Sequence, residues 1–110
     1  MVEIAHRFEI RLTRLDPTEG SEMQKIRPCI IISDEESNQY LHTVIIAPLT
    51  KTIKPFPTRV KCKFKDIQGT VALDQIRTVD KRRLIKKVGT MDFLTCETIC
   101  QTLQSMFGFY

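Results

Sequence analysis

The sequence predicts a mainly β, α+β fold: a small, strongly bent antiparallel sheet, close to a barrel, with one C-terminal helix. Several short runs either alternate apolar and polar residues or are continuously apolar and β-branched, and both patterns are typical of strands. A long run with apolar residues at helical spacing follows near the C-terminus. Short strands with one closing helix bury their apolar faces in a compact bent sheet, and small barrels of this kind often bind nucleic acid.

Six segments are predicted as strands. The first alternates strictly over residues 8–15, which predicts a half-buried strand, and the third is predicted to be buried on both faces and to end at Pro48. The fourth places Arg59, Lys61 and Lys63 on one cationic outer face. The six segments are residues 8–15, 28–33, 42–49, 58–64, 69–73 and 85–89.

The connections between these strands are polar or rich in proline. A turn signal at Asp16-Pro17 opens a polar loop that leads to the second strand. Residues 34–38 form a polar connection with room for one helical turn, and residues 50–57 contain two prolines and are predicted to be irregular. Residues 78–84 are predicted as a short helical or turn segment.

One amphipathic helix is predicted at the end of the chain. Asp92 is placed as its N-cap, and the helix is expected to end near Gly108. Its apolar stripe is interpreted as a core or dimer contact and consists of Cys96, Ile99, Cys100, Leu103, Met106 and Phe107.

The composition predicts one globular domain spanning residues 1–110. Hydrophobic residues make up 42% and charged residues 27% of the chain, which is ordinary for a globular domain. No apolar run approaches the roughly 20 residues that a membrane-spanning helix needs. Residues 1–8 carry charges where a signal peptide needs an apolar core, which predicts a cytoplasmic protein without a membrane partner.

The four cysteines are interpreted as reduced and mostly buried, because they contain no C-x-x-C pair. A zinc site made of Cys96, Cys100 and the two histidines would have a spacing that fits no standard pattern. Neither a metal nor another cofactor is therefore predicted.

The charge is uneven along the chain. Residues 1–50 hold five Lys/Arg against eight Asp/Glu, whereas residues 51–110 hold twelve against five. A basic second half indicates a polyanion partner such as nucleic acid, although a solvated basic surface produces the same pattern.

Arg27 is the first candidate for a functional residue. It stands at the mouth of an apolar strand, beside a polar loop that carries Glu22. An arginine on a rigid strand with a carboxylate on a neighbouring loop suits the binding and turnover of an anionic ligand. An ion pair of Arg27 with Glu22 or Asp74 that only holds the loop in place is the structural alternative.

Four sequence segments occur in a characteristic order. They are D-P-T-x-G-S-E (Asp16–Glu22), the pair Arg27-Pro28, A-P-L-T (Ala47–Thr50) followed by P-F-P, and D-Q-I-R-T-V-D (Asp74–Asp80). Together they resemble the MazF/PemK family of toxin endoribonucleases, and the likeness extends from about Phe8 to Phe107. The resemblance implies an SH3-like, CcdB/MazF-like barrel and a homodimer. It also implies sequence-selective cleavage of single-stranded RNA without a metal, blocked by an antitoxin with an acidic, flexible tail.

The resemblance also assigns site residues. Arg27 and Thr50 match the main catalytic positions of the family, and Glu22 matches a glutamate near the active site. Some PemK-type members carry a catalytic arginine two residues before the D-Q pair, where this chain has Ala72. The chain is therefore closer to the MazF subtype. Arg11 stands where many relatives have an aromatic residue, which is expected to alter the RNA or dimer surface.

The expected reaction is attack of the RNA 2′-hydroxyl on the phosphate, leaving a 2′,3′-cyclic phosphate and a 5′-hydroxyl. Arg27 is assigned to charge stabilisation, Glu22 to proton transfer and Thr50 to positioning. RNA contacts are predicted for Ser21, Lys25, Lys51, Lys54, Phe56, Asp74, Gln75 and Arg77.

Two of these assignments have structural alternatives. Asp74, Gln75 and Arg77 either read base edges or tie the fifth strand to the following turn. Phe56 either stacks on a base or packs between its two prolines.

Other functions remain open from the sequence. A non-catalytic CcdB-like inhibitor of DNA gyrase would share the barrel but would need neither Arg27 nor Thr50, and an RNA-binding module would have the groove without the reaction. A ribonuclease with a histidine acid/base pair would use His6 and His42, but the sequence places no second histidine near either of them.

Overall fold

The computed structural model describes residues 4–15 and 25–109. The strands are β1 (Glu9–Arg14), β2 (Ile26–Ile31), β3 (Thr43–Thr50), β4 (Arg59–Phe64), β5 (Ile67–Ala72), β6 (Arg77–Asp80) and β7 (Leu84–Thr90). The helices are α1 (Glu35–Tyr40) and α2 (Phe93–Phe107), with two 3-10 turns, η1 (Leu73–Gln75) and η2 (Lys81–Arg83).

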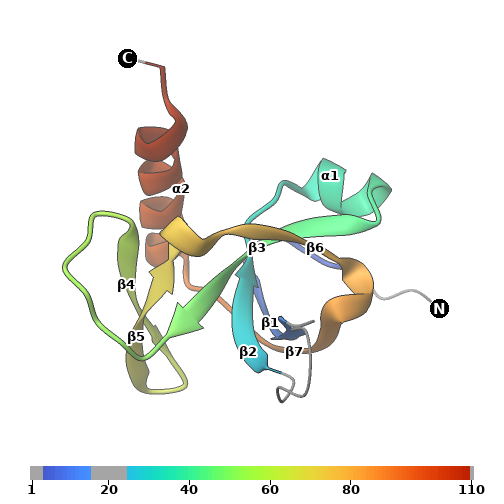
Figure 1. The fold of residues 1–110 in the computed structure, drawn as a ribbon, viewed down its shortest axis with the longest axis horizontal. Helices are drawn as coiled ribbons and strands as arrows, with labels where there is room; N and C mark the ends of the chain where they lie inside the picture. Colours follow the sequence, from blue (N-terminus) through green and yellow to red (C-terminus); the bar gives the residue numbers. More distant parts are fainter. Residues whose placement is uncertain (1–3, 16–24, 110) are drawn as a thin grey trace, which may run out of the picture.

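Strand β3 connects the two halves of a curled antiparallel sheet. Its first half pairs with β6, its middle pairs with β2, and its last two residues pair with β5. The strand order is β4-β5-β3-β2-β1-β7, with β6 beside β3 as an additional strand. Figure 1 shows β3 crossing the molecule between these two groups of strands. The expected bent, barrel-like antiparallel sheet with a C-terminal helix is confirmed.

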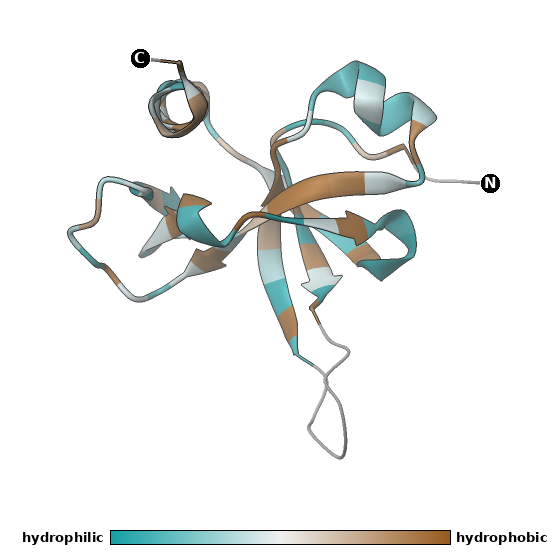
Figure 2. Ribbon diagram, turned by 45° about the horizontal axis from the view of Figure 1, so that its top comes forward, coloured by the Kyte–Doolittle hydropathy of each residue, from teal (hydrophilic) through white to brown (hydrophobic). Residues whose placement is uncertain are grey.

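The inner strands bury side chains on both faces. Ile30 of β2 packs in one apolar cluster, together with residues of β3 and with Cys96 and Ile99 of α2. The neighbouring Ile31 points to the other face and packs in a second cluster with residues of β3 and Val79 of β6. In Figure 2 hydrophobic residues run along the central strands, whereas η2 is hydrophilic. Strand β2 and the strands beside it therefore pack against an apolar cluster on each face of the sheet.

Strand β1 differs from the half-buried strand that its alternation predicts. Glu9 and Arg11 are buried, whereas Leu12 is only half-buried. Arg11 Nη2 and Nε donate to Glu9 Oε1 at 2.8 and 3.1 Å, and Arg11 Nη2 also donates to the Ile4 carbonyl at 3.0 Å. The chain before β1 thus covers this face. The expectation that Arg11 alters an RNA or dimer surface is wrong for this fold, because its side chain is only 3% exposed.

Two predicted boundaries of secondary-structure elements also differ from the structure. Pro48 lies inside β3, paired with Cys29, and does not end the strand, because β3 continues for two residues that pair with β5. Residues 78–84 are only partly a turn, since Thr78 and Val79 pair with β3 before the chain enters η2. Pairing across the sheet decided both points, and the local sequence does not show it.

The hairpin between β4 and β5 is tighter than the interval between the predicted strands 58–64 and 69–73. Only Lys65 and Asp66 turn the chain, with φ of 50° and 63°. Two successive residues with positive φ match the right-handed twist of a two-residue hairpin. Strand β5 therefore begins at Ile67, two residues before the predicted Gly69.

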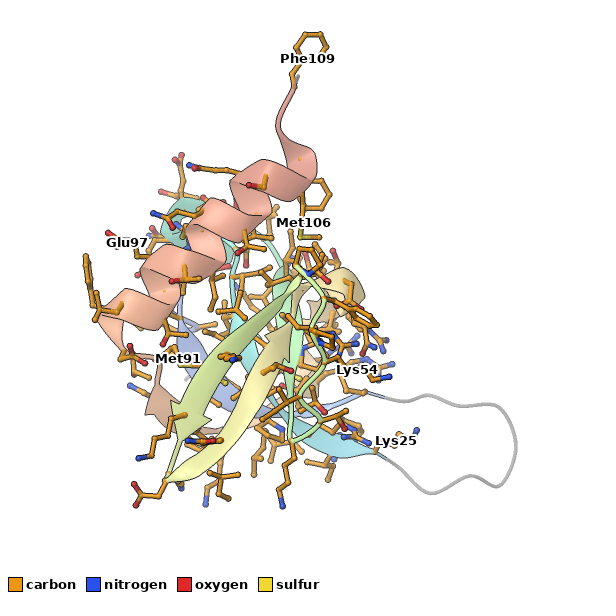
Figure 3. All side chains as sticks on the ribbon, turned by 90° about the vertical axis from the view of Figure 1, so that its left-hand side faces the viewer. Lys25, Lys54, Met91, Glu97, Met106 and Phe109 are labelled. Carbon is orange, nitrogen blue, oxygen red and sulfur yellow. The ribbon has the colours of Figure 1, made fainter. Side chains whose placement is uncertain are left out.

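The ends of α2 follow the predicted signals, and an aspartate caps α1 in the same way. Asp34 caps α1 by accepting the Ser37 N–H at 2.9 Å, and Asp92 caps α2 by accepting the Thr95 N–H at 3.0 Å. Gly108 follows the last residue of α2, as expected. In Figure 3 Phe109 projects beyond α2, while Lys25 and Lys54 lie on the opposite side of the molecule.

Candidate active site

Arg27 and Thr50 are brought together by the pairing of β2 with β3. The β2–β3 ladder ends at the pair of Cys29 with Pro48, two residues from Arg27 on one strand and two residues from Thr50 on the other. Both residues line one groove with a volume of about 520 Å³. Two residues 23 positions apart in the sequence therefore share one site, as the sequence analysis expected.

The groove is strongly cationic. Its described wall contains no carboxylate and is formed by Leu15, Lys25, Arg27, Pro48, Leu49, Thr50, Thr52, Lys54, Arg59, Gln75 and Arg77. Like charges in one concave surface raise the local concentration of an anion. Arg27 is exposed to solvent, so its guanidinium is accessible to a phosphate.

The Thr50 hydroxyl is oriented by the following loop. Its Oγ1 accepts the Thr52 N–H at 3.1 Å, and the Thr52 carbonyl accepts the Thr70 hydroxyl at 3.0 Å. A hydroxyl that accepts at its oxygen keeps its own proton for donation. Thr50 can therefore donate to a phosphate oxygen beside Arg27.

Asp74 is held by Arg59 and not by Arg27. Arg59 Nε donates to Asp74 Oδ1 at 2.7 Å and Nη2 to Oδ2 at 3.2 Å, and the Thr58 hydroxyl donates to Oδ1 at 3.1 Å. The hydrogen bond from Arg59 lowers the pKa of Asp74 to about 2. Asp74 thus ties η1 to β4, and Arg27 keeps no carboxylate partner among the described residues.

Several other predicted residues lie in or beside the groove. Arg77 Nη1 donates to the Leu15 carbonyl at 3.0 Å, which brings this arginine to the start of the loop after β1. Phe56 lies under two cations, with Lys54 Nζ and Arg59 Cζ each 5.8 Å from its ring centre. Lys51 lines a neighbouring apolar pocket and not the groove. Ser21 and Glu22 lie outside the described residues.

Arg59 is a groove residue that the sequence analysis did not select. Alternation along its strand placed it with Lys61 and Lys63 on an outer face, and neither of these lysines lines the groove. The missing information is the β4–β5 register, which pairs Arg59 with Ala72, two residues before Asp74.

The two histidines lie away from the groove. His6 Nδ1 is 3.2 Å from Glu35 Oε2, and the His42 carbonyl accepts the Lys81 N–H at 2.9 Å. Neither histidine is among the described residues that line the groove. The structure therefore offers no support for a histidine acid/base pair at this site.

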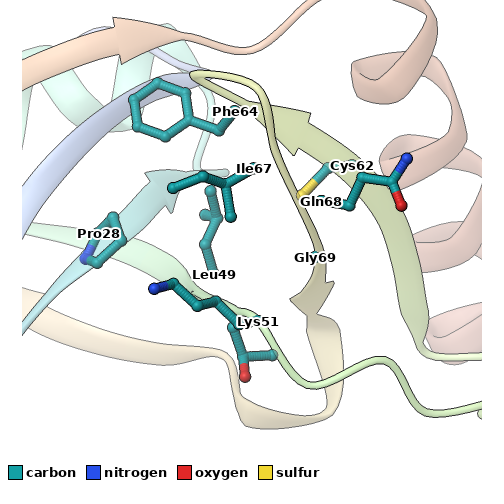
Figure 4. A pocket seen from close by; sticks show the side chains of 9 residues that line it. Pro28, Leu49, Lys51, Cys62, Phe64, Ile67, Gln68 and Gly69 are labelled. Atoms are coloured by element: carbon teal, nitrogen blue, oxygen red, sulfur yellow. The ribbon is translucent and has the colours of Figure 1, made fainter.

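An apolar pocket of about 100 Å³ adjoins the groove at Thr50. It is lined by Pro28, Leu49, Thr50, Lys51, Cys62, Phe64, Ile67, Gln68 and Gly69 (Figure 4). Gly69 brings β5 so close to β3 that a Cβ at this position would collide with the Thr50 carbonyl oxygen. The position of Thr50 thus depends on a glycine in the next strand.

For the RNA cleavage that the resemblance implies, we expect Gly69→Ala to lower kcat/KM about 100-fold, because Thr50 must shift and small displacements at a site have effects of this size. Gly89→Ala is the matched control, since its Cβ would meet the Phe64 ring, which can move, at 2.6 Å. The melting temperature of each variant is measured as well, so that a loss of activity can be separated from a loss of stability. Equal activity of the two variants would contradict a role for Gly69 in placing Thr50.

The cysteines are free, as expected, and Cys29 and Cys96 are buried. Burial raises the pKa of each of these two thiols to about 11. Within residues 4–15 and 25–109, no three His, Cys, Asp or Glu side chains are grouped as metal ligands. No helix in this part of the chain is long and apolar enough to span a membrane.

A curled antiparallel sheet with a cationic groove at its strand ends defines a class of small barrel proteins that bind polyanions. Comparison with known proteins gives the family. Residues 6–107 match the model of the PemK-like, MazF-like toxin of type II toxin–antitoxin systems. The chain is 42% identical over 88 residues to the endoribonuclease MazF of Staphylococcus saprophyticus, covering 74% of this chain and 73% of that protein.

Solved structures have the same fold. An endoribonuclease in complex with its cognate antitoxin from a mycobacterial species aligns with a TM-score of 0.80 and 25% identity, covering 96% of this chain and 97% of that one. A MazE–MazF structure from Deinococcus radiodurans has a TM-score of 0.85 and 20% identity over 99% of this chain and 100% of that one, and shows the fold alone. The chain belongs to the PemK-like, MazF-like family of toxins of type II toxin–antitoxin systems.

Proposed function

We propose that this protein is a sequence-specific endoribonuclease toxin that cleaves single-stranded RNA in the groove of Arg27 and Thr50, with residues 1–110 acting as one domain. The observation that carries the proposal is that Arg27 and Thr50 line one cationic groove whose described wall has no carboxylate. The 42% identity to an endoribonuclease supports the same reaction.

Cleavage begins with attack of a ribose 2′-oxygen on the adjacent phosphorus. The P–O5′ bond then breaks and the leaving 5′-oxygen takes up a proton from water, which leaves a 2′,3′-cyclic phosphate and a 5′-hydroxyl. Negative charge accumulates on the phosphate oxygens in the transition state, and the fixed charge of Arg27 stabilises it with two parallel hydrogen bonds. The Thr50 hydroxyl donates to a second oxygen and aligns the phosphate for attack.

Glu22 is the proposed group for proton transfer. A carboxylate can take the proton of the 2′-hydroxyl, whereas an arginine stays protonated and cannot act as the base. Glu22 precedes Arg27 by five residues and lies outside the described part of the chain. Each of these steps uses only protein side chains and water, so the proposed reaction runs without a metal or another cofactor.

The RNA strand is proposed to follow the groove. Lys25, Lys54 and Arg77 line it and neutralise backbone phosphates, and Gln75 offers an amide to a base edge. Phe56 is 50% exposed and offers a face on which a base can stack. Ser21 and Lys51 complete the proposed RNA contacts, whereas Asp74 is held by Arg59 and Thr58.

The cationic groove is also suited to bind an acidic antitoxin. A related endoribonuclease has been solved in complex with its cognate antitoxin. We propose that an antitoxin with an acidic, flexible tail covers the groove of this chain, because its carboxylates would compete with RNA phosphates for the same cations. We further propose that the toxin acts as a homodimer in the cytoplasm.

The test is incubation of the purified protein with a long single-stranded RNA in EDTA. Discrete fragments with 5′-hydroxyl and 2′,3′-cyclic phosphate ends are expected, since no proposed step needs a metal. Intact RNA that shifts on a native gel would replace the proposal by an RNA-binding module. Intact RNA that does not shift, together with inhibition of DNA gyrase, would replace it by a CcdB-like inhibitor.

A further inference from the structure

Arg59 is an arginine of the groove that reaches it from a different part of the sheet than Arg27. It lies at the start of β4 and lines the groove together with Thr50 and Arg77. Its side chain is only 8% exposed, although it carries a full charge. A largely buried arginine at the wall of a binding groove holds its guanidinium in one orientation, whereas an exposed lysine samples many conformations.

Asp74 sets this direction. It binds the Nε and Nη2 edge of the guanidinium with both carboxylate oxygens, at 2.7 and 3.2 Å. Asp74 is itself held by the Thr58 hydroxyl, and the Thr58 carbonyl accepts the Leu73 N–H at 3.0 Å. The low pKa of Asp74, about 2, keeps the carboxylate ionised at every physiological pH.

Two further contacts hold Arg59 in place. Its guanidinium lies over the Phe56 ring, and its backbone N–H donates to the Phe56 carbonyl at 3.0 Å. Across the strand pair, Arg59 faces Ala72, whose short side chain leaves room for the guanidinium. The loop of Phe56, strand β4 and turn η1 are thus joined at one side chain.

The guanidinium still has donors for a ligand. An arginine has five N–H donors, and the bidentate contact with Asp74 uses two of them. The Nη1 group donates to none of the described residues. An arginine that is fixed by a carboxylate on one edge can bind a phosphate with the other edge, without the entropy cost of ordering a flexible side chain.

We propose that Arg59 is a second phosphate-binding arginine of this groove, oriented by Asp74, that contacts an RNA phosphate next to the one held by Arg27. The inference rests on the proposed function and assigns it a residue from a strand that contributes no other predicted site residue. Asp74 acts as a positioning residue, because it sets the direction of Arg59.

Binding of a single-stranded RNA that carries 2′-O-methyl groups tests this, since such an RNA cannot be cleaved through its 2′-oxygen. Dissociation constants are measured at several salt concentrations for the wild type, for Arg59→Gln/Asp74→Asn and for Lys61→Gln. The double variant removes Arg59 without leaving the Asp74 charge unpaired. Lys61→Gln removes one charge from the same strand, at a residue that lines a different pocket.

The double variant is expected to bind about tenfold more weakly at low salt, and its slope of log K against log salt to fall by about 0.7, the value for one phosphate contact on a single strand. Lys61→Gln should keep the wild-type slope. Asp74→Asn alone keeps the charge of Arg59, so its slope should stay near the wild-type value while its affinity falls. Arg59→Gln alone, which should lose the same part of the slope, serves if the double variant does not fold.

A folded double variant with the wild-type slope, or an equal loss of slope in Lys61→Gln, would overturn the role of Arg59. If the double variant does not fold, a wild-type slope in folded Arg59→Gln would overturn it as well. A wild-type protein that does not bind the RNA at any salt concentration would instead overturn the proposed function, so the two failures are distinguishable.

Discussion

Replacing Arg27 with alanine is expected to lower kcat/KM for RNA cleavage about 100- to 1,000-fold, the usual effect of removing one donor that stabilises an oxyanion. The reason is that Arg27 is exposed in the groove that Thr50 also lines, so its guanidinium can reach a phosphate bound there. The loss should appear mainly in kcat, because the stabilised charge develops only in the transition state.

Two controls accompany this measurement. Lys61→Ala removes a positive charge outside the groove and should cleave at the wild-type rate. Arg27→Lys keeps the charge but loses the two-pronged contact, so an intermediate rate is expected. If folded Arg27→Ala still cleaves a mixed-sequence RNA within a few-fold of the wild type, the assignment of Arg27 is wrong.

Replacing Arg11 with methionine is expected to lower the free energy of unfolding by about 3 kcal/mol, the low end of the cost of breaking a buried ion pair, because buried Glu9 then keeps only Lys87 Nζ, at 3.4 Å, as an ion-pair partner. Burial acts to raise the pKa of Glu9, but hydrogen bonds from the His6 N–H and from Arg11 outweigh it and hold the pKa below its ordinary value. Urea denaturation at pH 7 measures the change.

The pH dependence and a double variant identify the cause. In the wild type, a lowered pKa of Glu9 adds stability above the pKa of the unfolded chain, and this stability is lost as the pH falls through the folded value. In Arg11→Met the deficit should shrink as acid protonates Glu9. Glu9→Gln/Arg11→Met should be less destabilised than Arg11→Met alone. Equal destabilisation would mean that packing of Arg11, and not the ion pair, matters.

Local sequence signals predicted the parts of the fold that depend on neighbouring residues. Asp92 and Gly108 mark the ends of α2 because capping is a contact within one turn of a helix. The two prolines of residues 50–57 predicted an irregular segment, which the structure confirms for residues 51–57, whereas Thr50 is the last residue of β3. Strand β1 shows the limit of such signals, since alternation does not reveal that the preceding segment covers Glu9 and Arg11.

For the site, the sequence by itself determined which side-chain charges and hydrogen-bond donors are present. The order of Arg27-Pro28, A-P-L-T and D-Q-I-R-T-V-D identified a MazF/PemK-like toxin and selected Arg27 and Thr50, because a side chain's charge and donors belong to the residue type. Only the tertiary structure decided which residues share the groove. Arg59 enters it, and Asp74 pairs with Arg59 and not with Arg27, because both depend on strand register, which is set by pairing between distant segments.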